Sequence, residues 1–321
     1  MSPRLRSALA TWTLAAVLPP CALAAAELAP GIRLVPGAFV PGRQPDGNSV
    51  LIAAPGGVIV IDTGRHPEHA RAIVEAVRAE GRPVVAVINT HWHLDHVGGN
   101  PRLRSAYPAL TVHASAAFEG ARTGFLARYR KQLEQLIAGT TDAEAQQPFR
   151  AELALLDAGA ALGPDEVVRA TGERTVAGRR LVVGLEGPAV TAGDVWVFDP
   201  ASGVLVAGDL VTLPVPLFDT ACPEGWKAAL GRLAAVGFTL LVPGHGSPMD
   251  RAGFARYRSA FERLLACAAS GAADPACVDG WLRDAGPLIP AGEREFARTL
   301  AGYYVGVLRD GEQVRALCAG K

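Results

Sequence analysis

The sequence predicts a layered α/β protein in which two β-sheets pack face to face and helices cover the outside. Short apolar runs typical of buried strands alternate with longer segments of helical periodicity. Polar side chains recur where such runs end, at Asp62, within residues 91–96, at Asp209 and at His245. Because a rigid sheet delivers side chains into the loops at its edge, this placement favours a functional site at one edge of the sandwich.

The N-terminus is typical of a secretory signal peptide. Arg4 and Arg6 precede an apolar stretch over residues 7–24, which ends in small residues. This stretch is short and contains two consecutive prolines, which favours cleavage near residue 24 over the alternative, an uncleaved membrane anchor. The sequence therefore predicts a secreted or periplasmic protein with no stable membrane anchor.

Export would place the remaining cysteines in an oxidising compartment, where an even number permits disulfides. Four cysteines follow the predicted signal peptide: Cys222, Cys267, Cys277 and Cys318. Cys267 and Cys277 flank a short loop between two helical patterns, which favours that pair, and Cys222 would then join Cys318. The cysteine spacings match no zinc-knuckle template. Free buried thiols are the alternative.

Charge and length exclude some classes of function. Lysine plus arginine and aspartate plus glutamate each total 31, so no net positive charge attracts nucleic acid or an anionic membrane. The chain after the signal peptide, about 300 residues, can bury one large core or a core with an appendage. The expected partner is a small-molecule substrate, and the oligomeric state stays open.

The first half of the chain predicts a hairpin, a helix, strands and then a helical region. Residues 48–54 and 58–61 are apolar, β-rich runs split by Pro-Gly-Gly, which is typical of a hairpin. A helical pattern over residues 67–80 follows and is closed by Gly81. The remaining elements expected in this half are strands at residues 84–88 and 110–113 and two or three helices over residues 115–156.

The second half predicts short strands and then helices. The expected strands cover residues 180–185, 195–198, 204–207 and 239–242, and the expected helices cover residues 226–235, 251–269 and 292–317. This pattern divides the chain into a signal peptide (1–24), a sandwich domain (25–250) with a helical insert at about 115–164, and a helical C-terminal extension (251–321).

The most informative segment is His91-Trp92-His93-Leu94-Asp95-His96. It contains three of the 7 histidines of the chain and one carboxylate. The segment follows the apolar run at 84–88 and precedes a Gly-Gly turn, so its side chains can converge on one point. Imidazole nitrogens and carboxylate oxygens are ligands of Zn²⁺. The pattern predicts a metal site, and scattered surface histidines are the alternative.

Together with three further motifs, this segment resembles the metallo-β-lactamase-fold hydrolases over about residues 45–250. The four motifs are, in order, Val60-Ile61-Asp62-Thr63-Gly64, Thr90-His91-Trp92-His93-Leu94-Asp95-His96-Val97-Gly98-Gly99, Ala207-Gly208-Asp209 and Pro243-Gly244-His245-Gly246. The resemblance implies a four-layer αββα sandwich with a two-metal zinc site at one edge.

The resemblance also implies roles for individual residues. His91 and His93 would serve the first zinc. Asp95, His96 and His245 would hold the second zinc. Asp209 would bridge the two metals, and Asp62 would orient the ligand loops through hydrogen bonds.

One position departs from the family's pattern. The family places a third histidine for the first zinc in a segment of the type Gly-Pro-Ala-His-Thr-x-Gly-Asp. Here the segment reads Gly187-Pro188-Ala189-Val190-Thr191-Ala192-Gly193-Asp194, and valine cannot coordinate a metal. The other histidines, His66, His69 and His113, are expected to be structural or exposed. We therefore expect one tightly bound zinc and a first site that is weak or empty, with the metal's identity left open.

The function implied by the resemblance is that of an exported zinc-dependent hydrolase, in which metal-bound hydroxide attacks an ester, lactone, thioester or amide-type bond. His91 or His93 would act as general base, or Asp95 or Asp209 if its metal contact loosened. The alternatives are a degenerate member that binds metal or ligand without turnover, and a β-lactamase. The substrate does not follow from the fold.

Overall fold

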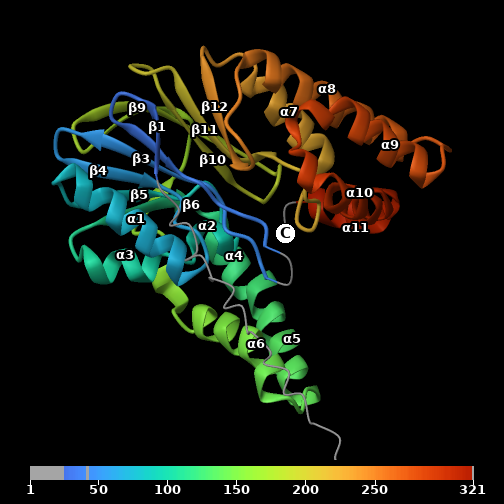
Figure 1. Cartoon of the computed structure of the whole chain (residues 1–321), viewed down its shortest axis with the longest axis horizontal. Helices are drawn as coiled ribbons and strands as arrows, with labels where there is room; N and C mark the ends of the chain where they lie inside the picture. Colours follow the sequence, from blue (N-terminus) through green and yellow to red (C-terminus); the bar gives the residue numbers. More distant parts are fainter. Residues whose placement is uncertain (1–24, 41–42, 320–321) are drawn as a thin grey trace, which may run out of the picture.

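The computed structural model describes residues 25–40 and 43–319, so the predicted signal peptide at residues 1–24 lies outside the described part. Two β-sheets pack face to face, and helices lie against their outer faces (Figure 1). The buried cluster between the sheets draws side chains from both, for example Ile59 and Ile88 from the first sheet and Val183 and Val206 from the second. The predicted αββα sandwich is confirmed.

The first sheet contains, within the described residues, seven strands that lie side by side in chain order. The neighbours β1 to β4 are antiparallel, whereas β4 to β7 run parallel to one another. The strands are β1 (Ala26–Ala29), β2 (Ile32–Val35), β3 (Ser49–Ala54), β4 (Gly57–Ile61), β5 (Val84–Ile88), β6 (Thr111–Ser115) and β7 (Glu166–Val168). Because β4 and β5 are parallel, the loops that follow them open at the same edge of the sheet.

The second sheet contains five strands in the described part of the chain, in the order β12-β11-β10-β9-β8. The strands are β8 (Gly172–Val176), β9 (Arg179–Glu186), β10 (Asp194–Asp199), β11 (Val204–Thr212) and β12 (Leu240–His245). Only the β11–β12 pair is parallel in this sheet as described. The C-terminal ends of β11 and β12 therefore lie next to each other.

The central strands are apolar along their whole length because both of their faces are covered. In β4, Ile59 and Ile61 pack into the cluster between the sheets, whereas Val58 and Val60 pack on the outer side with residues such as Ile73. Alternate side chains of a strand point to opposite faces. A strand buried on both faces therefore reads as one continuous apolar run, which is why these runs predict strands.

Helices complete the outer layers. They are α1 (Pro67–Glu80), α2 (Leu94–Val97), α3 (Asn100–Ala106), α4 (Ala117–Thr123), α5 (Phe125–Gly139), α6 (Ala143–Leu156), α7 (Pro223–Leu233), α8 (Arg251–Ala268), α9 (Asp274–Asp284), α10 (Arg294–Arg309) and α11 (Gly311–Cys318). The helix α1 ends before Gly81, whose φ of 66° is a left-handed conformation that glycine adopts readily. Among the helices described, none is both long and apolar enough to cross a bilayer.

The helical insert projects from the sandwich as the α5–α6 hairpin (Figure 1). At its base, Phe118 of α4 and Leu126 of α5 share a buried cluster with Trp92 and Leu94 of the histidine-rich segment. The insert therefore rests directly on the segment that carries the candidate ligands.

The C-terminal helices pack on the second sheet. Residues of α7, α8, α9 and α10 share one buried cluster with side chains of that sheet, including Trp226, Phe261 and Trp281 from the helices and Leu205 from β11. The structure contains the two favoured disulfides, Cys267–Cys277 and Cys222–Cys318. The second of these joins the start of α7 to the last turn of α11.

The structure differs from the sequence prediction at some elements. The strands β1, β2, β7 and β8 carry no signal strong enough to predict them, and β8 is a polar edge strand that takes its form from pairing with β9. The strand β11 continues to Thr212, beyond its predicted end, because Gly208 at a φ of 54° lets the strand bend without stopping. The helix predicted over 292–317 is two helices, α10 and α11.

Candidate metal centre

Six side chains from three segments converge at one edge of the sandwich. They form two groups, and within each group one ligand atom per residue lies within 4.8 Å of the others. The first group is His91, His93 and Asp209, and the second group is Asp95, His96 and His245. Residues 91–96 follow β5, Asp209 lies in β11 and His245 ends β12. The fold thus brings His96 next to His245, which is 149 residues away in sequence.

Two glycines let the main chain approach these side chains closely. A Cβ atom on Gly244 would lie 1.9 Å from Oδ1 of Asp209, and a Cβ atom on Gly208 would lie 2.5 Å from the Cβ of Thr90. Gly208 also has a φ of 54°, which disfavours any residue with a side chain. The glycines of the third and fourth motifs are therefore needed for the close packing of β11 and β12 against the candidate ligands.

Asp62 organises the loop after β5. Its Oδ1 accepts a hydrogen bond from the main-chain nitrogen of Thr90 at 2.7 Å, and its Oδ2 accepts one from Oγ1 of Thr90 at 2.7 Å. The same Oδ2 lies 2.8 Å from Nδ1 of His96. An ionised carboxylate can only accept, so Nδ1 of His96 carries a hydrogen, and Nε2 is the ring nitrogen that faces the other candidate ligands. Metal-binding histidines are typically oriented in this way.

Thr90 orients His91 in turn. Because the Thr90 hydroxyl donates its hydrogen to Asp62, its oxygen accepts from Nδ1 of His91, which lies 3.0 Å away. Nε2 of His91 therefore carries a lone pair, and this buried atom has no hydrogen-bond partner.

A second threonine orients His93 the opposite way. Thr220 donates its hydroxyl hydrogen to the main-chain oxygen of Val190 at 2.9 Å, and its Oγ1 lies 2.8 Å from Nε2 of His93. The hydroxyl therefore accepts from Nε2, which leaves Nδ1 of His93 with the lone pair. His93 is the one member of the two groups that is not fully buried.

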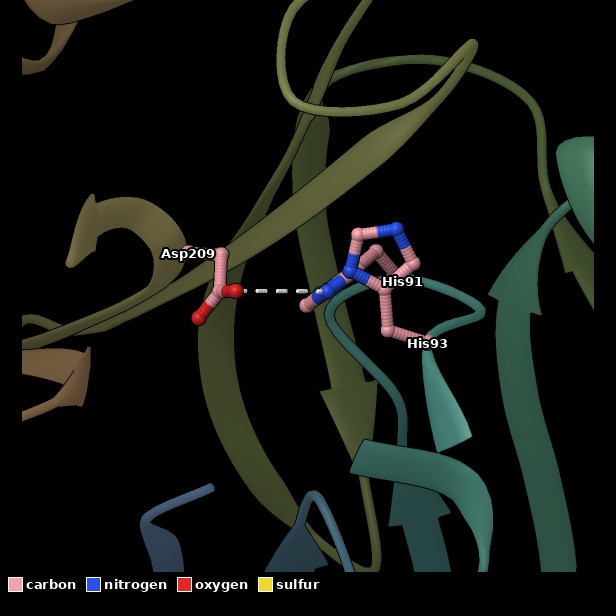
Figure 2. A group of neighbouring side chains, drawn as sticks. All are labelled: His91, His93 and Asp209. Carbon is pink, nitrogen blue, oxygen red and sulfur yellow. Dashed lines mark ion pairs between the residues drawn. The ribbon is translucent and has the colours of Figure 1, made fainter. Parts of the chain in front are cut away.

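Asp209 lies between the two groups. Figure 2 shows its carboxylate facing His91, with Oδ2 3.7 Å from Nε2 of His91. Its Oδ1 faces the second group, 3.3 Å from Nε2 of His96 and 3.6 Å from Nε2 of His245. Each oxygen thus serves a different group, and Asp209 is the residue positioned to contact both.

The electrostatics of the site favour a cation. Burial and the neighbouring His96 and His93 hold the pKa of His91 well below its usual value, so this ring is neutral at pH 7. Burial opposes ionisation of Asp209, yet His96 and His245 hold its pKa below the usual range. Burial also acts against the charged form of His96, but Asp209, Asp62 and Asp95 together raise its pKa well above the usual value. Three carboxylates around one ring create a site that attracts positive charge.

The donor set fits a divalent metal such as zinc. Neutral imidazole nitrogens and carboxylate oxygens are the ligands that such ions take. Nε2 of His91 and Oδ1 of Asp209 are buried with no hydrogen-bond partner among the described residues. Unpartnered buried polar atoms are rare in folded proteins and call for a physical reason. A cation in the first group would satisfy Nε2 of His91, and a cation in the second group would satisfy Oδ1 of Asp209.

The remaining histidines lie outside both groups. His66 pairs with Asp46 at 2.8 Å, and buried His69 lies 2.8 Å from Oγ of Ser49. His113 lies in β6. Because none of the three belongs to a ligand group, no other histidine of the described chain joins the first group in place of the one expected at Val190.

Val190 belongs to the apolar cluster beneath the second sheet and is fully buried, with 0% of its surface exposed. The segment after Asp209 packs into the same cluster through the buried side chains of Leu213, Val215 and Phe218. Trp92 is also buried and contacts the His93 ring, with 4.5 Å between ring centroids. These apolar residues pack around the site.

Sequence reasoning missed three residues that support the candidate ligands. Thr90 precedes the histidine-rich segment directly, so its position next to His91 was an available signal. Arg65 follows Asp-Thr-Gly in the first motif, and its side chain lies 3.8 Å from Asp95. Thr220 has no local signal, because its contact with His93 joins residues 127 positions apart.

Comparison with known proteins identifies relatives. A family model for the metallo-beta-lactamase superfamily matches residues 42–261. A linear primary-alkylsulfatase from a Pseudomonas species is 25% identical over 219 residues, which cover 62% of this chain and 41% of that protein. A hydroxyacylglutathione hydrolase from Gloeobacter violaceus is 48% identical over 54 residues, which cover 17% of this chain and 21% of that protein. The chain thus matches less than half the length of either protein.

Solved structures share the fold at low sequence identity. A metallo-beta-lactamase from Pontibacter korlensis has a TM-score of 0.53 at 19% identity, covering 74% of this chain and 98% of that one. A structure of TMB-1 has a TM-score of 0.54 at 18% identity, covering 76% of this chain and 98% of that one. At these identities the likeness concerns the fold alone.

Proposed function

Because the chain belongs to the metallo-beta-lactamase superfamily and its relatives are hydrolases, we propose that it is an exported zinc-dependent hydrolase acting on a small molecule. The bond that it cleaves is of the ester, lactone, thioester or amide type. The convergence of two groups of candidate ligands on one edge of the sandwich is the observation that carries this proposal.

Each candidate ligand has a defined donor atom. His91 would bind through Nε2 and His93 through Nδ1, because Thr90 and Thr220 occupy their other nitrogens. His96 would bind through Nε2, because Asp62 holds its Nδ1. The second group would add Asp95 and His245, and Asp209 would contact both metals.

A divalent metal held there supplies Lewis acidity, which lowers the pKa of a water molecule toward 7 and polarises the substrate oxygen. The chain must then accept a proton and pass it to solvent. When the first site is empty, Nδ1 of His93 keeps its lone pair and can accept a proton. Of the candidate bases, His91, His93, Asp95 and Asp209, only His93 is partly exposed, so we assign the proton's exit path to His93. Thr220, which is also partly exposed, keeps the His93 ring in place.

The two groups differ in ligand supply, which supports one tight site and one weak site. The second group has three buried ligands of its own, with Asp209 as a fourth. The first group has His91, His93 and a share of Asp209, and Val190 stands where a third histidine is expected. Fewer ligands leave more open coordination positions and a lower affinity.

Metal content of the purified protein, measured by elemental analysis, tests this proposal. We expect about one zinc per chain, rising toward two in Val190→His. Val190→Leu is the matched control, because it changes the same buried position without adding a ligand, and its zinc content should stay near one. Two zinc ions in the unmodified chain would contradict the one-site part. No zinc, even after zinc addition, would overturn the metal-dependent hydrolase.

Activity is tested with a panel of esters, lactones, thioesters, amides, β-lactams and alkyl sulfates, with and without a chelator. We expect hydrolysis of at least one substrate, and we expect the chelator to abolish it. Asp209→Asn should lower the rate of hydrolysis by at least 100-fold. Zinc binding without turnover of any substrate would favour a degenerate member, and turnover of β-lactams alone would favour a β-lactamase.

Export is tested separately by N-terminal sequencing of the protein produced with its full leader. Cleavage near residue 24 is expected, and the two disulfides of the structure support an oxidising compartment. A full-length cytosolic product would contradict this part of the proposal.

A further inference from the structure

The helical hairpin of the insert has one buried polar contact with the rest of the protein. Glu152 is the only buried residue of α6 among those described, although it carries a charge. Its Oε2 lies 2.6 Å from Nη1 of Arg65 and accepts a hydrogen bond from the hydroxyl of Tyr129 on α5 at 3.1 Å. In the described chain, this ion pair is the only one that joins α5 or α6 to residues outside the insert. Burying two charges costs desolvation free energy even when they are paired, so the presence of this pair requires an explanation.

Arg65 connects this pair to the candidate metal centre. Its side chain is only 10% exposed, and Nη2 lies 3.8 Å from Oδ1 of Asp95. The other oxygen of Asp95, Oδ2, lies 3.0 Å from Nε2 of His245. One face of the Asp95 carboxylate therefore points at the second ligand group, while the opposite oxygen points at the arginine.

The charges of Asp95, Arg65 and Glu152 explain why a glutamate lies beside the arginine. A cationic guanidinium beside Asp95 orients the carboxylate, but its positive charge alone would repel a divalent cation nearby. Glu152, 2.6 Å from the same guanidinium, offsets that charge. Arg65 can then orient Asp95 with little net effect on the cation.

We propose that Arg65 is a positioning residue for the second metal site, and that Glu152 and Tyr129 couple the helical hairpin to that site through it. The hairpin is then part of the support for a metal ligand. This inference rests on the proposed function, because it takes Asp95 to be a metal ligand. By reciprocity, metal binding must stabilise the docked hairpin by the same free energy by which the docked hairpin favours metal binding.

The zinc affinity of the metal-free protein, measured by competition with a chromophoric chelator, tests the proposal without any substrate. Arg65→Met should weaken zinc binding by about 10- to 100-fold, the usual loss when a group that orients a ligand is removed. Arg65→Lys should recover part of the affinity, since one ammonium cannot span Asp95 and Glu152 as a guanidinium fork does. Glu152→Gln should also weaken binding, because it leaves the arginine's charge unbalanced.

Arg104→Met is the matched control. Arg104 also clamps the insert, through the main-chain oxygens of Ala161 and Gly163 and the side chain of Asp165, but it has no contact with Asp95. Its loss should lower the Tm and leave the zinc Kd within about twofold of the unmodified protein. The double variant Arg65→Met/Glu152→Gln should bind zinc no more weakly than Arg65→Met alone, because both residues act through the same contact.

Hydrogen exchange provides a second readout. Zinc should slow amide exchange in residues 143–156 of the unmodified protein, and this protection should be lost in Arg65→Met. If Arg65→Met binds zinc as tightly as the unmodified protein, or if zinc protects α6 equally in both, the coupling is overturned. If the unmodified protein binds no zinc at all, the proposed function fails, which is a distinguishable result.

Discussion

At the scale of single residues, Asp62 has the widest influence on the candidate metal centre. It holds Nδ1 of His96 directly and controls the His91 ring through Thr90. One carboxylate thus fixes the orientation of a ring in each ligand group, and both rings turn Nε2 toward the site. Asp62 can do this because an ionised carboxylate only accepts hydrogen bonds, so every group that it contacts must donate to it.

Asp62→Asn should lower zinc affinity by about 10- to 100-fold while the fold is kept. Asparagine tolerates the left-handed backbone of this position, where φ is 59°. However, its amide replaces one acceptor by a donor, which then faces N–H or O–H groups of Thr90 and His96. Chelator competition and circular dichroism measure the two effects.

Asp165→Asn is the control for that experiment. It makes the same chemical change in a carboxylate that pairs with Arg104 away from the ligands. Equal zinc affinities for the unmodified protein and Asp62→Asn would show that the hydrogen bonds of Asp62 do not orient the histidines.

At the scale of elements, the parallel pair β11 and β12 decides whether the site forms. The pairing of the two strands shifts register on both sides of Gly208, where β11 bends, and it resumes where Thr212 pairs with His245. The strand turns so that Asp209 faces His91 (Figure 2). Its other carboxylate oxygen lies 3.3 Å from Nε2 of His96. This arrangement needs two glycines where a strand ordinarily favours β-branched residues.

Gly244→Ala should displace Asp209 and abolish tight zinc binding. The new methyl group would lie 1.9 Å from Oδ1 of Asp209 and 2.8 Å from its main-chain nitrogen, so β11 must shift. Overpacking of this kind costs about 1–3 kcal/mol of stability. Urea denaturation and zinc content measure the two effects together.

Gly231→Ala on α7 is the matched control, since a Cβ there meets nothing within 4 Å. Alanine favours a helix over glycine by about 1 kcal/mol, so this variant should be more stable and retain its zinc. Normal zinc binding by Gly244→Ala would contradict the close approach of β12 to Asp209.

At the scale of the whole molecule, the C-terminal helices stabilise the second sheet. They bury the outer face of that sheet in one continuous cluster, and the Cys222–Cys318 disulfide closes the layer from α7 to α11. Tyr304 of α10 also donates a hydrogen bond to Asp219, the neighbour of Thr220. Through Thr220, the C-terminal layer reaches the candidate ligand His93.

Loss of the Cys222–Cys318 disulfide should cost more stability than loss of Cys267–Cys277. The first disulfide closes a loop of 96 residues and the second a loop of 10. The chain-entropy treatment of cross-links gives about 4–5 kcal/mol for the longer loop and about 3 kcal/mol for the shorter one. Urea denaturation of the double alanine variants at each pair measures the difference. A larger loss for Cys267→Ala/Cys277→Ala would contradict the prediction.

The sequence was sufficient to predict the sandwich and the side chains that the structure brings together at its edge. Local patterns carry this information. A strand buried on both faces must be apolar throughout, as at residues 84–88. Three imidazoles and a carboxylate within six consecutive residues necessarily lie close together in space. The four motifs in order then selected Asp62, Asp209 and His245 as companions of that segment.

The orientation of these side chains, in contrast, depends on contacts between segments that are far apart in the sequence. Thr220 reaches His93 across 127 residues, and Glu152 reaches Arg65 across 87. The strands β1 and β8 likewise take their form from neighbours in the sheet. Periodicity reports only which face of an element is buried. Hydrogen bonds between distant segments depend on how the elements pack, and so they leave no regular trace in the sequence.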